Sequence, residues 1–334
     1  MSLSNILSLL DSSYKRYTSM HKIHNKNAMT HLSFYWLPEN RELIEKGIES
    51  EFASFLESSI DSGKITLPPI PEVVTQIQKL CSSDSTTVMD VADCLVEDPG
   101  LTATVIRVAN SVIFNRRNIQ CTEVITAVSR LGIVRVRDIV TAQAIEQLKN
   151  SVNLSKECNQ ILRQSAHVSK ELAATMVMVS KEFRQADSNE YQHLSSDKAL
   201  LTGLLADIGL FCIVNEYYLY LENGNYLDSE LALRIFSTLC PAASRLVLEK
   251  WGFDTDFIDV AMNQNSQSLD VDVSYLDVAR IANHILMFRR KDKNIDEHTV
   301  EVDITGADIL YNLTNLSDIE FRNKIQELIR ASGL

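Results

Sequence analysis

The sequence predicts an all-α protein. Almost every periodic stretch repeats its apolar residues at the three- or four-residue spacing of a helix. Residues that begin and end helices recur along the chain, such as Asp98-Pro99 at a start and Leu131-Gly132 at an end. Only residues 294–306 alternate loosely and suggest an extended segment. With 334 residues, 45% of them hydrophobic, the chain can bury one large core or two smaller ones.

Charge and cysteine content narrow the class of protein. The formal net charge of −12 argues against a general surface for nucleic acids or anionic membranes, because phosphate binding relies on Lys and Arg. Six cysteines without C-x-x-C spacing indicate reduced thiols in the core. The N-terminus lacks the basic and apolar regions of a signal peptide, and no later apolar run reaches the length of a membrane span. We therefore expect a cytoplasmic protein.

Residues 1–63 are interpreted as an N-terminal helical extension. Helical patterns cover residues 3–20 and 41–60, and the aromatic residues Phe34, Tyr35 and Trp36 lie between them. The chain's one histidine cluster also falls here, at His21, His24 and His31. Histidines spaced by three residues can share a helix face as metal ligands do. The surrounding basic residues would repel a cation, so a solvated polar face is the favoured interpretation: Lys15, Arg16, Lys22 and Lys26.

The region 64–152 predicts a series of short helices. Three prolines in Leu67-Pro-Pro-Ile-Pro71 impose an extended entry. Asp84-Ser-Thr-Thr87 supplies N-cap candidates, and Asp98 can cap a helix that has Pro99 at its first position. The expected helices cover residues 72–81, 88–97, 99–110, 122–131 and 133–149.

Longer helices are expected after residue 152. Residues 155–183 are amphipathic, and their Met-Val-Met-Val run at 176–179 indicates core packing more than a soft-metal site. A polar loop at 184–197 precedes the most apolar run of the chain, residues 200–214. This run is too short for a bilayer and predicts a central buried helix. Further helices are expected at 228–239, 241–251, 256–263, 274–290 and 318–329.

One carboxylate, Asp207, lies in the middle of the apolar run. Burying an ionised carboxylate without a partner costs several kcal/mol. Asp207 must therefore be paired, hydrogen-bonded, protonated or bound to a metal.

Five motifs follow one another in an order that resembles the HDOD domain, the HD-related output domain of bacterial signalling proteins. They are Leu67-Pro-Pro-Ile-Pro71, Val91-Ala92, Glu97-Asp-Pro-Gly-Leu-Thr102, Arg107-Val-Ala-Asn-Ser111 and Ile125-Thr-Ala-Val-Ser-Arg-Leu-Gly132. The resemblance covers about residues 64–290. It implies a multi-helix HD-like bundle, with an N-terminal helical subdomain at 64–152 and a degenerate HD-like subdomain at 153–290. Residues 291–334 would be a C-terminal extension that ends in a helix.

The resemblance also says where a metal site would lie. The stretch Gly203-Leu-Leu-Ala-Asp-Ile-Gly209 looks like the G-L-L-H-D-I-G signature of HD-superfamily phosphohydrolases, with Ala206 at the histidine position. The superfamily's first histidine falls at Gln164, and its final aspartate falls at Arg280. Neither an amide oxygen nor a guanidinium can replace those ligands. His167, three residues after Gln164, is a weak substitute.

These losses predict a vestigial cleft at Gln164, His167, Asp207 and Arg280, with no catalytic residue, metal or cofactor. Arg280 is expected to form an ion pair with Asp207 in place of the metal. The resulting hypothesis is a non-enzymatic signalling module that binds a partner protein or a small ligand.

Two alternatives stay open: a metal-dependent phosphohydrolase with a rearranged site, and a nucleotide-sensing domain that binds phosphate through Arg280. Candidates for partner contacts are the aromatic residues Phe34, Tyr35, Trp36, Tyr217, Tyr218 and Tyr220.

Overall fold

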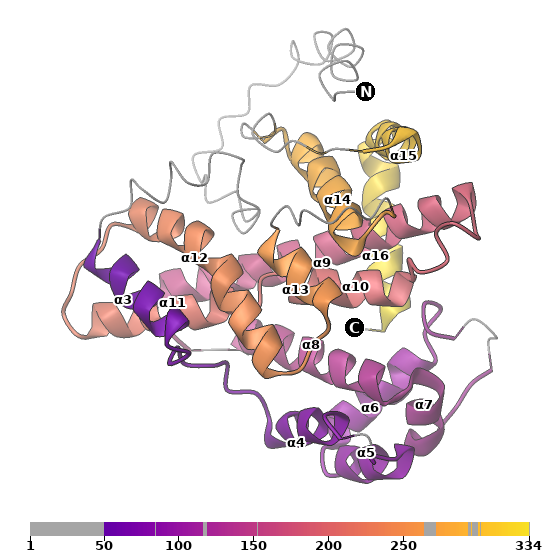
Figure 1. Cartoon of the computed structure of the whole chain (residues 1–334), viewed down its shortest axis with the longest axis horizontal. Helices are drawn as coiled ribbons and strands as arrows, with labels where there is room; N and C mark the ends of the chain where they lie inside the picture. Colours follow the sequence, from indigo (N-terminus) through magenta and orange to yellow (C-terminus); the bar gives the residue numbers. More distant parts are fainter. Residues whose placement is uncertain are drawn as a thin grey trace, which may run out of the picture.

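The fold is known from a computed structural model of the chain. It describes residues 50–83, 85–115, 119–151, 153–263, 272–292, 295, 300 and 302–333, apart from the side chain of Glu230. Within these ranges the regular elements are helices and no strand is present, which confirms the predicted all-α class (Figure 1). The histidine cluster and the aromatic residues at 34–36 lie outside the described residues.

The predicted N-terminal subdomain contains the short helices that its proline and N-cap residues predicted. Thr87 and Asp90 form a capping box, and the Asp98 side chain accepts a hydrogen bond from the Leu101 N–H one residue after Gly100. Residues 64–71, which contain the three prolines, are not helical. The helices are α4 (Glu72–Cys81), α5 (Val88–Val96), α6 (Pro99–Ala109), α7 (Val124–Leu131) and α8 (Ile133–Ser151).

Asn110 gives the Arg107-Val-Ala-Asn-Ser111 motif a structural role, because its side chain binds the backbone of the loop that follows α6. Its side chain accepts from the Cys121 N–H at 2.8 Å and donates to the Cys121 carbonyl at 2.7 Å. Arg130 on α7 donates to the Ala109 carbonyl at 2.9 Å, so one of the carbonyls at the C-terminal end of α6, which lack partners within the helix, has a hydrogen bond. These contacts fix the loop between α6 and α7, because one amide holds both backbone groups of a residue eleven positions away.

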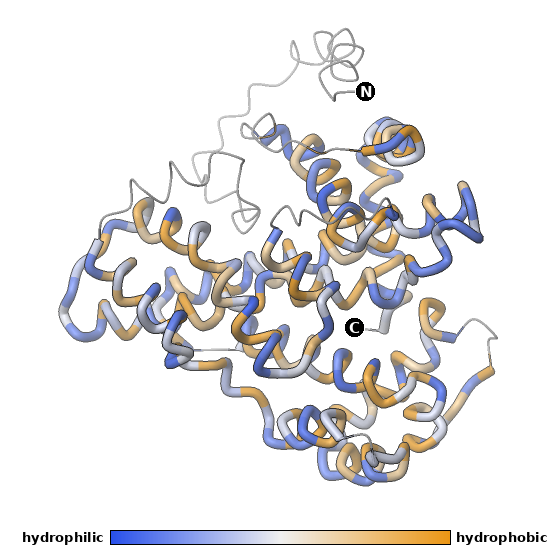
Figure 2. Tube along the Cα trace, in the orientation of Figure 1, coloured by the Kyte–Doolittle hydropathy of each residue, from blue (hydrophilic) through white to orange (hydrophobic). Residues whose placement is uncertain are grey.

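The second group of helices is built around the longest one, α9 (Lys156–Ala186), which contacts α8, α10, α11 and α14. Its Met176-Val-Met-Val179 run is buried, as expected for core packing. Hydrophobic and hydrophilic residues alternate along these helices, as the colouring of the trace shows (Figure 2). The helices packed around it are α10 (Ser196–Leu205), α11 (Gly209–Glu222), α12 (Ser229–Lys250), α13 (Thr255–Met262) and α14 (Tyr275–Arg290).

The end of the predicted N-terminal extension joins this core. Helix α3 (Glu51–Asp61) packs against α11 and α12. Phe52 lies against Tyr217 and Tyr220, with ring centroids 5.9 and 5.0 Å apart. Tyr217 is only 1% exposed, so its proposed role as a partner contact is wrong. The ring is a core residue that packs against Phe52 and Phe236.

Three sequence expectations about helix boundaries are wrong. The apolar run 200–214 is not one helix but the end of α10, a turn at residues 206–208 and the start of α11. Pro241 does not begin a new helix; it lies inside α12, which stays continuous because residues on both sides, Phe236 and Val247 among them, are buried in the core. The tail is helical from Ile304, where the Asp303 side chain accepts from the Gly306 N–H.

The C-terminal extension contains two helices, α15 (Ile304–Thr314) and α16 (Asp318–Ser332). Both pack against α9, and α15 also contacts α14 (Figure 1). The final helix was expected, whereas α15 was not.

Two helical segments pass a length-and-composition test for membrane spans, contrary to the sequence expectation: Ser196–Glu222 and Leu231–Lys250. In their most apolar windows 83% and 61% of the residues are buried inside the protein. The first segment is also interrupted by the turn at 206–208. Their apolar character is accounted for by packing within the chain.

Candidate functional site around Asp207

Asp207 lies in the turn between α10 and α11, and two glycines bring that turn into the core. A methyl group added at Gly203 would lie 2.5 Å from Ala173 Cα on α9. One added at Gly209 would lie 2.2 Å from the Ser244 backbone nitrogen on α12. The Gly209 N–H also donates to Ser244 Oγ at 2.9 Å. The two glycines of the Gly203–Gly209 motif are therefore required for close helix packing.

The Asp207 carboxylate is completely buried and bonded through both oxygens. Oδ1 accepts from the Lys149 ammonium at 2.7 Å and lies 2.8 Å from Ser169 Oγ, while Oδ2 accepts from the Ser165 hydroxyl. Lys149 itself is only 2% exposed. Both oxygens of the carboxylate thus have partners within the fold, as a buried charge requires.

The predicted ion pair between Arg280 and Asp207 is wrong, because Lys149 is the cation at Asp207. Lys149 reaches this position from the end of α8, 58 residues earlier in the chain. Arg280 on α14 instead donates from Nε to Asn263 Oδ1 at 2.8 Å.

The described contacts of the Asp207 carboxylate are with Lys149, Ser165 and Ser169, and not with Gln164, His167 or Arg280. Ala206 is buried next to Asp207 and has no donor atom. His167 on α9 is 71% exposed and lies 3.5 Å from Glu171. Gln164 is partly buried on the same helix. Among the residues that the structure describes, no three His, Cys, Asp or Glu side chains lie close enough together to hold a metal ion.

Chemically the site is a closed, internally neutralised cluster. The Lys149 ammonium can donate three hydrogen bonds and lies 3.5 Å from Ser169 Oγ. Burial raises the pKa of the Cys240 thiol, and the negative charge of Asp207 raises it further. The thiol is therefore protonated and not a nucleophile at neutral pH. These groups are suited to holding helices together more than to reacting with a ligand.

Sequence reasoning missed Lys149, although a signal was present. Thr141, Ile145 and Lys149 follow one another at four-residue spacing and are all buried. A lysine that continues the apolar stripe of a helix needs a buried counter-ion, and Asp207 is the isolated carboxylate that needs a cation.

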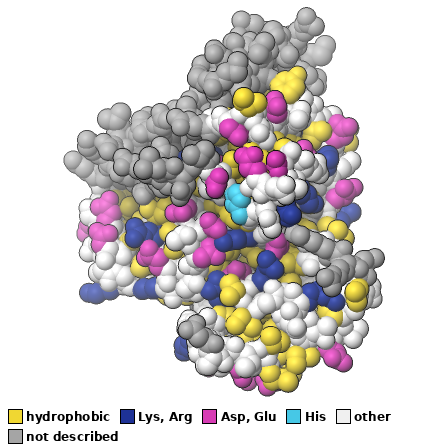
Figure 3. All heavy atoms as spheres, turned by 45° about the vertical axis from the view of Figure 1, so that its right-hand side comes forward, with side chains coloured by type: hydrophobic (Ala, Val, Ile, Leu, Met, Phe, Trp, Pro, Cys, Tyr) yellow, Lys and Arg dark blue, Asp and Glu magenta, His cyan; other side chains and the backbone are white. Residues whose placement is uncertain are grey.

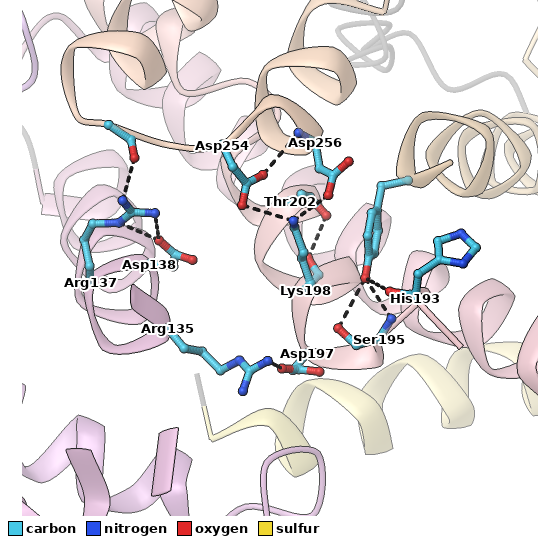
Figure 4. A network of polar contacts seen from close by, with 12 residues as sticks. Arg135, Arg137, Asp138, His193, Ser195, Asp197, Lys198, Thr202, Asp254 and Asp256 are labelled. Atoms are coloured by element: carbon cyan, nitrogen blue, oxygen red, sulfur yellow. Dashed lines mark hydrogen bonds and ion pairs between the residues drawn. The ribbon is translucent and has the colours of Figure 1, made fainter. Parts of the chain in front are cut away.

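A second polar network joins the two predicted subdomains, as Figure 4 shows. Arg137 on α8 donates to the Gly252 carbonyl at 2.5 Å and lies 4.6 Å from the Phe253 ring centroid. Arg135 on α8 pairs with Asp197 on α10 at 2.5 Å. The start of α8 is thereby fixed to the HD-like side, just as Lys149 fixes its end.

Two neighbouring groups complete this network (Figure 4). Lys198 pairs with Asp254 at 3.0 Å and with Asp256. The Tyr275 hydroxyl donates to the His193 carbonyl at 2.8 Å and accepts from the Ser195 N–H at 2.7 Å. Basic and acidic side chains also lie interspersed over the face in Figure 3. Ion pairs and hydrogen bonds of this kind are typical of contacts that hold packed helices together.

Asp138 is the unusual member of the network. Its Oδ1 accepts from Arg137 Nε at 2.8 Å, and the side chain is buried. Burial raises the pKa of this carboxyl to about 6, although the Arg137 charge opposes the shift. A buried carboxylate with a raised pKa is less stable when ionised than one in water.

Comparison with known proteins finds a matching family and solved structures of similar fold. The model of the HDOD domain family matches residues 67–267, which is more than half of the chain. No curated protein matches. A solved structure from Shewanella amazonensis SB2B, named "Putative metal-dependent phosphohydrolase", has a TM-score of 0.65 and 20% sequence identity, and the match covers 84% of this chain and 98% of that one.

A second solved structure is an HDOD domain protein of unknown function from Geobacter sulfurreducens. Its TM-score is 0.47 at 18% identity, with 83% of this chain and 97% of that chain covered. At such identities the likeness to solved structures concerns the fold.

Proposed function

This chain belongs to the HDOD domain family, and we propose that it acts as a non-catalytic signalling module that binds a partner protein or a small ligand. The proposal has two parts: the HD-type metal chemistry is lost, and the packed scaffold is kept for binding. The first part rests on the residues around Asp207, and the second on the contacts of Arg135 and Arg137 that join the two predicted subdomains.

The observation that carries the proposal is the contact between Lys149 and Asp207. HD-type hydrolysis requires a divalent cation that activates water and neutralises phosphate charge. Lys149 places a positive charge 2.7 Å from the one aspartate that the metal-binding signature retains. A second cation at that carboxylate would be repelled by the ammonium, and hydrogen bonds from Lys149, Ser165 and Ser169 already occupy both of its oxygens.

The other signature positions support the same conclusion. Ala206 offers no ligand atom, Gln164 offers a neutral amide, and Arg280 carries a fixed positive charge. His167 cannot replace them from its exposed place on α9, where it lies beside Glu171. A metal site would require new ligands from other parts of the chain.

Metal content and hydrolysis test the proposal directly. We expect tag-free, full-length protein incubated with Mn²⁺, Mg²⁺ or Zn²⁺ and then desalted to retain far less than one equivalent by mass spectrometry. We also expect no turnover of a chromogenic phosphodiester above that of a protein-free blank. One bound equivalent together with turnover that Asp207→Asn abolishes would overturn the proposal.

A thermal-shift series tests which kind of small ligand is bound. Nucleotides and cyclic dinucleotides should raise the melting temperature in a concentration-dependent way if one of them is the signal. If a nucleotide does so and Arg280→Gln removes the effect, the module is a nucleotide sensor. If none does so, a protein partner is favoured.

A further inference from the structure

Large apolar side chains are exposed at the end of the molecule where the described chain begins. Phe55 on α3 is 48% exposed, Leu219 on α11 is 43% exposed, and Tyr226 in the loop after α11 is 84% exposed. Exposed apolar residues that gather in one place mark interaction surfaces, whereas scattered ones need no explanation. The contacts between α3 and α11 decide which case applies here.

These contacts bring the exposed side chains to one end of the molecule. The Phe52 ring centroid lies 5.0 Å from that of Tyr220, so the start of α3 lies beside the end of α11 (Figure 1). The Asn225 side chain donates to the Tyr220 carbonyl at 3.0 Å and holds the following loop against the same end of α11. The apolar surface formed there, which we call the end patch, consists of three residues: Phe55, Leu219 and Tyr226.

The chain enters this end of the molecule through Ser50. Its backbone is extended, with φ −138° and ψ 148°, and its hydroxyl accepts from the Ala53 N–H at 3.0 Å. This N-cap begins α3 at Glu51, so the chain changes direction there instead of running on along the helix axis. The residues before Ser50 therefore start close to the end patch.

The part of the chain before Ser50 contains an apolar segment that fits this surface. Phe34-Tyr-Trp-Leu37, which lies outside the described residues, places four large apolar side chains in succession. Aromatic side chains bury a large area when they pack against other rings.

The length of chain between this segment and α3 allows the two to meet. Residues 38–49 span up to about 40 Å when extended and about 18 Å when helical. Either length is enough to reach a patch that begins one turn into α3. A connection this short also keeps the segment at a local concentration in the millimolar range, so a weak contact is sufficient for docking.

The charges beside the two apolar surfaces are complementary. Residues 15–26 contain four basic residues and no Asp or Glu. Glu51 and Glu222 are exposed, and they lie four residues from Phe55 and three residues from Leu219 on the same helix faces. The acidic rim of the end patch therefore attracts the basic stretch that precedes the aromatic segment.

We propose that residues 34–37 dock on the end patch of the same chain and form an aromatic strap across α3 and the end of α11. The strap covers the three exposed apolar residues, and the basic stretch before it lies over Glu51 and Glu222. The N-terminal extension is then part of the folded body, although it precedes the family match, which begins at residue 67.

Tryptophan fluorescence of the full chain tests the docking. The chain has two tryptophans, Trp36 and Trp251, so Trp251→Phe leaves Trp36 as the reporter. In this parent variant we expect Trp36 to emit at shorter wavelength, and to be quenched less by acrylamide, than in the urea-denatured chain. Adding Tyr226→Asp should lower the ratio of docked to free segment roughly tenfold, as the loss of one buried aromatic contact allows. Emission and quenching should then move toward the denatured values.

Tyr311→Asp is the matched control. Tyr311 is also an exposed tyrosine, but it lies on α15, which packs against α9 and α14. This substitution should leave the fluorescence of Trp36 unchanged. Hydrogen exchange of residues 34–37 applies the same comparison with Trp251 in place, should Trp251→Phe fail to fold.

Three results would overturn the proposal. The first is a Trp36 that is as accessible in the folded parent as in the denatured chain. The second is an equal effect of Tyr226→Asp and Tyr311→Asp. The third is protection of Trp36 that disappears on dilution, which would assign the end patch to a second copy of the chain.

Discussion

The Lys149 ammonium and the Asp207 carboxylate form an ion pair at 2.7 Å in which the side chains are 2% and 0% exposed. The pair joins the end of α8 to the turn between α10 and α11. It therefore connects the predicted N-terminal subdomain to the predicted HD-like one at Asp207, the residue that the sequence resemblance marked as a candidate metal ligand. The same contact explains why an isolated carboxylate is compatible with the most apolar run of the chain.

Removing one partner of this pair should destabilise the protein strongly. Lys149→Met leaves Asp207 buried without its counter-ion, and we expect the free energy of unfolding to fall by about 3–5 kcal/mol. The double variant Lys149→Met/Asp207→Leu removes both charges, so it should recover most of that loss. Urea denaturation of the full chain measures both. A loss in the double variant equal to the sum of the losses in Lys149→Met and Asp207→Leu would mean that the charges do not interact.

Much of the fold follows from local chemistry and was predictable. The helix starts at Thr87 and Asp98 depend on side chains that bond to backbone within three residues, and those bonds are present. The core role of Met176 and Met178 follows from helical periodicity alone. Such features need no knowledge of the rest of the molecule.

The site could not be predicted in the same way, because its contacts are long-range. The pairing of Asp207 with Lys149 depends on how α8 crosses the core, and motif positions pointed to Arg280 instead. The turn at 206–208 could not be predicted, because the residues around it are apolar and their pattern predicts one continuous helix. Only the close approach of Gly209 to α12 shows why the chain must bend there.

Substituting Gly209 should therefore be more harmful than its small size suggests. Gly209→Ala would place a methyl group 2.2 Å from the Ser244 backbone nitrogen, and backbone cannot move aside as a side-chain tip can. We expect a loss of about 1–3 kcal/mol in unfolding free energy. Gly100→Ala is the control, because the nearest atom there is the Asp98 carboxylate oxygen at 3.2 Å. Thermal and urea unfolding should separate the two variants clearly.

Asp138 should make stability fall as the pH rises from about 4 to about 6. Its pKa is raised from 3.8 to about 6 in the fold, so the folded state holds a proton over this range that the unfolded state has released. The penalty is on the order of 2–3 kcal/mol above pH 6 and absent below pH 4. The free energy of unfolding of Asp138→Asn, minus that of the wild type, should therefore increase as the pH rises from 4 to 7.

The control for that measurement is a carboxyl whose pKa is shifted in the direction opposite to that of Asp138. Arg137 and Lys198 favour the ionised carboxyl of Asp138, whereas Asp254 opposes it. Asp187 has a pKa lowered from 3.8 by hydrogen bonds from the Glu190 and Asn189 N–H groups, so the stability difference between Asp187→Asn and the wild type should stay constant from about pH 5 to pH 7 and shrink only as the pH falls below 3.8. The same pH trend in both variants would contradict the assignment.

Arg289 should hold the C-terminal helices in place. Its guanidinium donates to the carbonyls of Leu313 and Leu316 at 2.7 and 2.9 Å, and it lies 4.0 Å from the Phe321 ring centroid. Lysine cannot reproduce this planar set of donors. We expect Arg289→Lys to increase hydrogen exchange in α15 and α16 and to cost about 1–3 kcal/mol of unfolding free energy.

Arg245 provides the comparison for Arg289. It forms an exposed ion pair with Glu249 at 2.7 Å within α12, and pairs of this kind contribute about 0.3–0.5 kcal/mol. Arg245→Lys should therefore leave exchange in every helix unchanged. If both substitutions had the same small effect, the hydrogen bonds of Arg289 to the α15–α16 turn would not be what holds α16 against α9. The attachment would then depend on the buried apolar residues of α16, Phe321 and Ile325, alone.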